Sequence, residues 1–252
     1  MMDQATTQDR MRSILILVAT IATIAFNGLA ATGYVNGVTP EVISEKYPTV
    51  LTPAGYAFTI WSLIYVGLLA FSIYQLLPRN VRRFRPVRTL YVISCFLNCA
   101  WIYFWHREQV AICLVLIFAL LMSLIFMLIL FRRGTDEGSL FTKTVFGIYA
   151  GWVTAATLVS FTIFLKYMGV ELSSGMWSAL GALCLLFAAG LAVFVRLKLQ
   201  NYLYPLAIAW AATAIAVKQS GNTAIVVAAS VCVIVGLVMA VSFVMDQKSS
   251  TT

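Results

Sequence analysis

Apolar residues run almost without interruption along this chain, in stretches of roughly 20 residues that short polar segments separate. Such runs predict membrane-spanning helices, because about 20 helical residues cross a hydrocarbon core about 30 Å thick. The runs do not alternate with a period of two, which excludes the strands of an outer-membrane barrel. The candidate spans are 13–34, 54–77, 89–105, 109–131, 140–165, 176–195, 201–217 and 223–245.

The run at 201–217 is the weakest of these candidates, because it is short and contains Pro205. Proline is tolerated near the start of a helix, and the polar segment 218–222 favours a turn after it. We therefore predict an all-α fold, a polytopic membrane helix bundle of about eight transmembrane helices, with seven spans as the alternative.

Composition agrees with this fold class. Of the 252 residues, 62% are hydrophobic and 10% are charged, against roughly 45–50% and 25% in soluble domains. These values exclude a soluble globular enzyme.

All five cysteines lie inside apolar runs, so we interpret them as small buried hydrophobes. His106 is the single histidine, so no multi-histidine metal site can form, and we expect no metal.

The charged residues report the orientation of the chain in the membrane. The chain carries 17 Lys and Arg against 9 Asp and Glu, and basic residues gather in cytoplasmic loops. In the eight-span arrangement, the loops on one side of the membrane carry four basic residues: Lys46, Arg107, Lys166 and Lys218. Thirteen fall on the other: Arg10, Arg12, Arg79, Arg82, Arg83, Arg85, Arg88, Arg132, Arg133, Lys143, Arg196, Lys198 and Lys248. We expect both termini to be cytoplasmic, in the cell (inner) membrane, and no nucleic-acid partner.

The positions of the acidic residues bear on whether the protein is an ion-coupled pump, and the first apolar run raises the question of a signal peptide. All nine acids lie between or outside the apolar runs, and the absence of an intramembrane carboxylate argues against an ion-coupled pump. The first run could be a signal peptide, but it is long and lacks a clear cleavage site. We expect an uncleaved first helix. The arginine-rich segment 79–88 is interpreted as a topology anchor at lipid headgroups.

Aromatic residues form stripes on three of the predicted helices. A long proline-rich outer loop, 36–53, leads into the first of them. Residues spaced three and four apart share a helix face. The stripes are Phe58, Trp61 and Tyr65; then Asn98, Trp101, Phe104 and Trp105; then Tyr149, Trp152 and Ala156. From spacing alone they indicate an interfacial belt or a bundle core. The mid-span amides of Asn27 and Asn98 need a partner, either another helix or a ligand.

These residues together resemble the TspO/MBR family, the tryptophan-rich sensory or translocator proteins. The resemblance rests on Pro53, Gly55, Tyr56, Phe58, Trp61, Tyr65 and Gly67, on Leu97, Asn98 and Trp101, and on Tyr149, Trp152 and Ala156. The chain departs from the family pattern at three positions. Trp61 follows Phe58 by three residues instead of four, Ile148 replaces a proline, and Ser160 stands where asparagine is common.

The resemblance covers about residues 13–165 and implies a TspO-like five-helix membrane domain there. The last three helices have no counterpart in five-helix members of the family, so hydropathy adds three additional transmembrane helices at 166–245, with cytoplasmic tails at 1–12 and 246–252. The resemblance also implies a non-enzymatic receptor or carrier that binds a tetrapyrrole, porphyrin or haem, or less favourably a sterol. No cofactor is required. The implied pocket residues are Tyr56, Phe58, Trp61, Tyr65, Asn98, Trp101, Tyr149 and Trp152.

Several alternatives stay open from the sequence. The chain could be a secondary transporter of a small neutral or amphipathic solute, or an enzyme that uses Glu41 and Glu45, four residues apart. His106 could ligate a haem iron, although a solvated turn residue is the simpler interpretation. Lys46 or Arg107 could meet a ligand carboxylate. Gly147 and Gly151 permit close helix packing, either inside the chain or in a homodimer.

Overall fold

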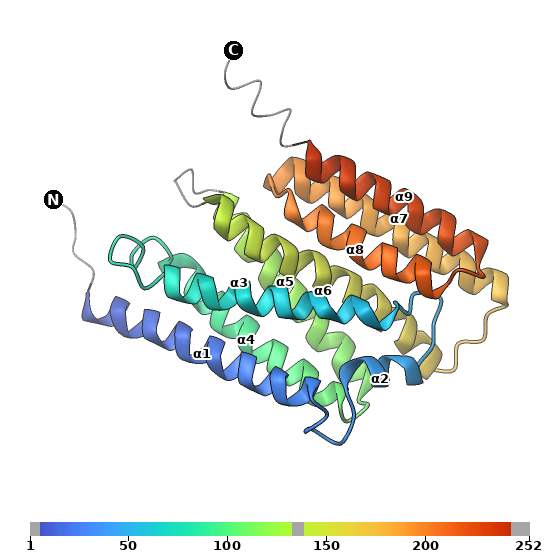
Figure 1. Cartoon of the computed structure of the whole chain (residues 1–252), viewed down its shortest axis with the longest axis horizontal. Helices are drawn as coiled ribbons and strands as arrows, with labels where there is room; N and C mark the ends of the chain where they lie inside the picture. Colours follow the sequence, from blue (N-terminus) through green and yellow to red (C-terminus); the bar gives the residue numbers. More distant parts are fainter. Residues whose placement is uncertain (1–5, 133–138, 243–252) are drawn as a thin grey trace, which may run out of the picture.

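The computed structural model describes residues 6–132 and 139–242, and every regular element in these ranges is helical (Figure 1). The elements are α1 (Thr7–Ala31), α2 (Pro40–Lys46), the 3₁₀ helix η1 (Gly55–Thr59), α3 (Ile60–Tyr74), α4 (Arg85–Trp105), α5 (Val110–Arg132), α6 (Ser139–Tyr167), α7 (Ser174–Leu199), α8 (Leu203–Lys218) and α9 (Thr223–Val241). In the described ranges, seven helices are long and apolar enough to cross a membrane, and α8 is a shorter apolar helix. The predicted all-α membrane bundle is confirmed.

The helix α8 occupies the run that looked weakest in the sequence. Its 16 residues extend about 24 Å, less than a hydrocarbon core of about 30 Å. It packs against α6, α7 and α9, so neighbouring helices cover most of its surface. Pro205 is the third residue of α8, in the first turn, where backbone N–H groups lack helical partners.

The loop predicted at 36–53 contains a helix that we did not predict. The helix α2 begins at Pro40, directly after Thr39, and proline suits a first helical position because its φ angle is fixed near the helical value. Ahead of it, Gly33 and Gly37 have φ angles of +75° and +72°, which glycine adopts without a steric penalty. The chain therefore turns sharply after α1 and brings α2 across the end of the bundle (Figure 1).

The long helices form two groups. The helices α1, α4, α5, α6 and α3 pack side by side in that cyclic order, while α7, α8 and α9 pack on one another (Figure 1). The groups join mainly where α8 packs on α6. The cysteines are free, and all except half-buried Cys99 are buried, which confirms their interpretation as packing residues.

Close contact between α6 and α8 explains the glycine pair at Gly147 and Gly151. A Cβ atom added at Gly151 would lie 2.6 Å from the carbonyl oxygen of Tyr204, and one added at Gly147 would collide with the side chain of Asn201. Beside them the hydroxyl groups of Thr154 and Tyr204 lie 2.8 Å apart in a hydrogen bond. Of the two roles left open by the sequence, these glycines take the contact inside the chain.

We expect Gly151→Ala to lower the stability of the protein by about 1–3 kcal/mol, because the added methyl group forces α8 away from α6. The measurement is thermal unfolding in detergent. Gly190→Ala is the matched control: Gly190 also lies inside a long helix, α7, but a Cβ atom there meets nothing within 4 Å, so the substitution should be neutral or slightly stabilising. Equal unfolding temperatures for the two variants would contradict the close α6–α8 contact.

Candidate functional site

The three aromatic stripes meet around the ring of Trp61. Its centroid lies 6.4 Å from that of Trp101, 5.9 Å from that of Tyr149 and 6.2 Å from that of Trp152. It also stacks on Tyr65, with 5.6 Å between centroids and 17° between planes. Aromatic rings at these separations attract one another beyond their buried area. The side chains that the spacing places on α3, α4 and α6 therefore form one cluster inside the bundle.

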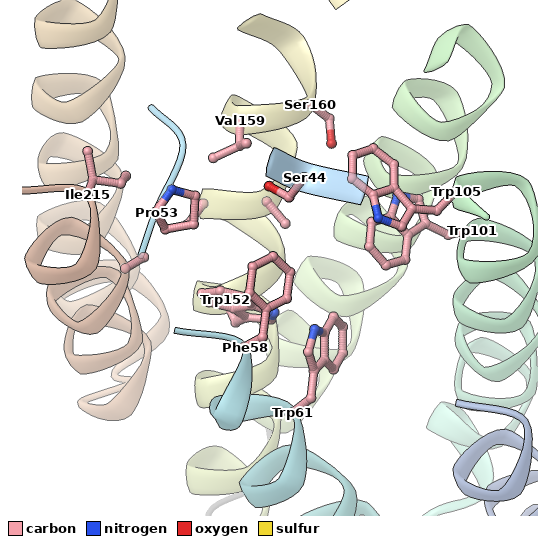
Figure 2. Close-up of a pocket in the computed structure, with 13 residues that line it drawn as sticks. Ser44, Pro53, Phe58, Trp61, Trp101, Trp105, Trp152, Val159, Ser160 and Ile215 are labelled. Atoms are coloured by element: carbon pink, nitrogen blue, oxygen red, sulfur yellow. The ribbon is translucent and has the colours of Figure 1, made fainter. Parts of the chain in front are cut away.

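An inner cavity of about 40 Å³ opens beside this cluster. Figure 2 shows Trp101 and Trp105 together on one wall, with Phe58, Trp61 and Trp152 grouped on another. Pro53 and Ile215 lie across the cavity from the Trp101 pair. The lining residues are Ser44, Pro53, Phe58, Trp61, Trp101, Trp105, Trp152, Ala155, Ala156, Val159, Ser160, Ala211 and Ile215.

Two of the indole groups in this wall have unused hydrogen-bonding capacity. Trp101 and Trp152 are 5% and 4% exposed, and in the described part of the chain neither Nε1–H has a hydrogen-bond partner. By contrast, Trp105 donates its Nε1–H to the carbonyl oxygen of Pro40 at 3.1 Å. An unpaired buried donor costs about 1–3 kcal/mol. The cavity is therefore walled largely by aromatic rings, and two of these rings carry a buried N–H group without a partner.

A second hollow, which we call the outer groove, lies on the other side of Trp61. It has a volume of about 320 Å³ and runs between α1 and α3 beneath α2. Its lining residues are Ile24, Asn27, Gly28, Ala31, Pro40, Glu41, Gly55, Phe58, Thr59, Trp61, Ser62, Tyr65 and Ile102. Phe58 and Trp61 line both hollows, so their two side chains form the partition between them.

The predicted pocket residues separate into three positions. Phe58, Trp61, Trp101 and Trp152 line the inner cavity, and Tyr65 lines only the outer groove. Tyr56 lines neither hollow. It is 41% exposed and packs edge-on against Trp210 of α8, with 5.4 Å between ring centroids.

Asn98 and Tyr149 lie behind the aromatic rings and also line neither hollow. The Nδ2–H of Asn27 donates to Asn98 Oδ1 at 2.7 Å, and the Nδ2–H of Asn98 donates to the hydroxyl oxygen of Tyr149 at 2.9 Å. Asn98 is 1% exposed. The partners of the two mid-span amides are therefore other helices, the first of the two options that the sequence left open.

The sequence analysis missed the rest of the cavity wall. Trp105 lies four residues after Trp101 and stacks on it at 5.6 Å, so helical spacing could have placed it in the site. Ser160, which stands where the family pattern favours asparagine, lines the cavity as well. The sequence could not predict that Ala211 and Ile215 of α8 line the cavity, because they are ordinary apolar residues outside the aromatic stripes.

The loop between α1 and α3, residues 32–54, covers this end of the bundle, and we call it the capping loop. Hydrogen bonds tie it to the turn after α4. Asn36 donates to the backbone oxygen of His106 at 3.0 Å, and both Lys46 and Tyr47 donate to the carboxylate of Glu108 at 2.7 Å. These contacts fix the α2 half of the loop above α4.

Contacts with the C-terminal end of α8 hold the other half of the capping loop and also reach α2. The N–H of Ala54 donates to the carbonyl oxygen of Ala214 at 3.0 Å, and Gln219 donates to the carbonyl oxygen of Thr49 at 3.0 Å. An ion pair joins Lys218 to Glu45 at 3.0 Å. The C-terminal helices therefore take part in the site twice, as cavity wall and as support for the loop.

The polar residues considered as ligand contacts near the loop make contacts within the protein, and Nε2 of His106 is buried with no hydrogen-bond partner among the described residues. His106 is 1% exposed and lines neither hollow, and its Nδ1 lies 2.8 Å from the carbonyl oxygen of Ile102. A carbonyl oxygen only accepts, so Nδ1 carries the proton. The expectation of a solvated turn residue at His106 is wrong, because its side chain is buried. Lys46 pairs with Glu108, and the guanidinium of Arg107 lies 4.6 Å from the ring centroid of Tyr103.

The contacts around Glu108 make the capping loop sensitive to acid. Hydrogen bonds from Lys46 and Tyr47 lower the pKa of Glu108 below its usual value, and the same carboxylate raises the pKa of Tyr47 to about 12. A carboxyl group with a lowered pKa stabilises the folded state above its unfolded pKa. That contribution is lost as the pH falls through the lower, folded value.

We expect Glu108→Gln to lower the unfolding temperature at pH 7, and the difference from wild type to disappear as the pH falls through the lowered pKa of wild-type Glu108. The measurement is thermal unfolding across this pH range. Glu171→Gln is the control, because Glu171 is exposed and has no ion pair in the described part of the chain. A constant difference at all pH values would show that the carboxylate charge is not the stabilising feature.

The fold and the site together define the class: a polytopic helical membrane protein with a cavity lined largely by aromatic side chains. The model of the family described as TSPO-like protein matches residues 13–242, so the chain belongs to this family. The match continues past residue 165 and includes α7, α8 and α9, which the sequence analysis set apart from the first five spans. No curated protein and no solved structure matches the chain. The family is membrane-bound, ligand-binding or sensory, and generally non-enzymatic.

Proposed function

We propose that this protein is a non-enzymatic membrane receptor or carrier for a flat, apolar ligand of the tetrapyrrole class, such as a porphyrin or haem, in sensing, sequestration or transport. The observation that carries the proposal is the inner cavity, whose aromatic wall includes the indoles of Trp101 and Trp152, each with a buried N–H group that has no partner among the described residues. A flat π-system stacks on such walls. Its acceptor atoms would take the two donors and remove the cost of leaving them unpaired.

The size of the cavity adds a condition to this proposal. At about 40 Å³ it is smaller than the roughly 300–1,000 Å³ typical of ligand pockets. The outer groove beyond Phe58 and Trp61 adds about 320 Å³. If the side chains of Phe58 and Trp61 change rotamer and no longer separate the inner cavity from the outer groove, the two hollows join into one space. A tetrapyrrole would therefore enter by displacing Phe58 and Trp61 and would then stack against them.

We expect Trp152→Phe to weaken protoporphyrin IX binding about 2- to 12-fold, the equivalent of one hydrogen bond of about 0.5–1.5 kcal/mol, because phenylalanine keeps an aromatic ring but lacks the donor. Binding to the purified protein in detergent is followed by the porphyrin absorbance, so that removing a tryptophan leaves the signal intact. The same variant without ligand should be as stable as wild type or more so, because an unpaired donor is gone.

Trp177→Phe is the control for this measurement. Trp177 lies on α7, where the ammonium of Lys166 is 5.7 Å from its ring centroid, and it does not line the inner cavity. This variant should bind the porphyrin like wild type. The proposal is wrong if Trp152→Phe and the equivalent Trp101→Phe both bind as tightly as wild type, or if wild-type protein does not bind protoporphyrin IX saturably.

A further inference from the structure

The outer groove contains a carboxylate whose chemistry the tetrapyrrole proposal does not use. Glu41 lies in the first turn of α2, is half-buried, and lines the groove. Among the described residues it has no hydrogen bond and no ion pair. The other acids of the described chain are either paired or exposed: Asp9 binds Arg85, Glu45 binds Lys218, Glu108 binds Lys46, and Glu171 is exposed. A sheltered carboxylate without a partner favours a cationic ligand, because desolvation of a charge must be offset by an opposite charge.

The remaining walls of the groove suit the same ligand. Phe58, Trp61 and Tyr65 follow one another along η1 and α3, so their rings extend from the Glu41 end into the bundle. Trp61 and Tyr65 stack on each other. Aromatic faces attract an ammonium group, most strongly where water is excluded. The rest of the surface is largely apolar, with contributions from Ile24, Gly28 and Ala31 of α1 and from Ile102 of α4.

A polar acceptor also faces this space. Asn27 lines the groove and donates its Nδ2–H to Asn98 and to the carbonyl oxygen of Thr23. None of the hydrogen bonds among the described residues ends on its Oδ1. Nδ2 therefore uses both hydrogens inside the bundle, while the carbonyl end of the amide is left without a donor and can face a positive group. Glu41 and this amide oxygen therefore both present negative charge density to the groove.

From these observations we propose that the outer groove is a binding site for an amphipathic organic ammonium compound, with Glu41 as counter-ion and the rings of Phe58, Trp61 and Tyr65 around its cation and apolar body. The volume of about 320 Å³ suits a small ligand. The site goes beyond the proposed tetrapyrrole function, because Glu41 does not line the inner cavity. The ammonium group could belong to a free amine or to the choline headgroup of a phospholipid.

The test uses the purified full-length protein in dodecyl maltoside, with benzyltrimethylammonium as probe and neopentylbenzene as an uncharged probe of the same shape. Binding is followed by tryptophan fluorescence. Glu41→Gln should weaken benzyltrimethylammonium binding about tenfold and leave neopentylbenzene binding unchanged. Glu45→Gln is the matched control, because Glu45 lies on the same helix but pairs with Lys218 outside the groove, and it should bind both probes like wild type.

Two results would overturn the inference: equal benzyltrimethylammonium affinity in wild type and Glu41→Gln, or the same loss in Glu45→Gln. A third result would show that the substitution damages the capping loop instead of removing a counter-ion. If Glu41→Gln weakens protoporphyrin IX binding by the same factor, the loop is disturbed and the assignment of Glu41 as a counter-ion is wrong. Conversely, failure of protoporphyrin IX to bind wild type would remove the tetrapyrrole proposal while leaving the Glu41 result intact.

The source of the ammonium group is decided by competition. Dihexanoyl phosphatidylcholine should displace benzyltrimethylammonium if the groove takes a lipid headgroup, whereas dihexanoyl phosphatidylglycerol, which lacks the ammonium, should not. If neither lipid displaces the probe, the groove takes a free amine. Displacement by both lipids to the same extent would mean that acyl chains, and not the cation, occupy the groove, and would overturn the proposal.

Discussion

The chain of hydrogen bonds from Asn27 through Asn98 to Tyr149 is the constraint on which the aromatic site depends. It joins α1, α4 and α6 inside the bundle, where buried polar side chains need hydrogen-bond partners, so the three helices present these groups to one another. A rotation of α4 that broke these bonds would leave the Tyr149 hydroxyl without its partner and Asn27 with only its bond to the Thr23 carbonyl oxygen. The polar pairing therefore fixes which face of each helix points inward.

The aromatic rings follow from this orientation. Trp101 lies three residues after Asn98, and Trp152 lies three after Tyr149, so both are neighbours of a hydrogen-bonded residue on the same helix face. Trp61 then fills the space between them and divides the inner cavity from the outer groove. The polar chain stabilises the bundle from behind, while the rings in front remain free to stack on a ligand. One partition thus separates two hollows with different chemistry, one with N–H donors and the other with a carboxylate.

The C-terminal helix α8 supplies the remaining wall of the inner cavity and supports the capping loop. Gly147 and Gly151 let α8 approach α6 closely, and this approach places Ala211 and Ile215 in the cavity wall. The same position brings Ala214, Lys218 and Gln219 under the capping loop. Because α8 is short, its C-terminal end meets the loop without extending past it. The family match across residues 13–242 includes α7, α8 and α9 together with the first five long helices.

The sequence by itself determined the fold class, the approximate limits of the spans and the aromatic faces, because hydropathy and helical spacing are local properties. It also identified Phe58, Trp61, Trp101 and Trp152, which line the inner cavity. Only the tertiary structure decided that Asn98 and Tyr149 lie behind the rings, that Tyr56 packs on Trp210, and that Glu41 is left unpaired in a groove. Those outcomes depend on which helices are neighbours and on what each side chain meets across the bundle, and neither is encoded in the spacing of residues along one helix.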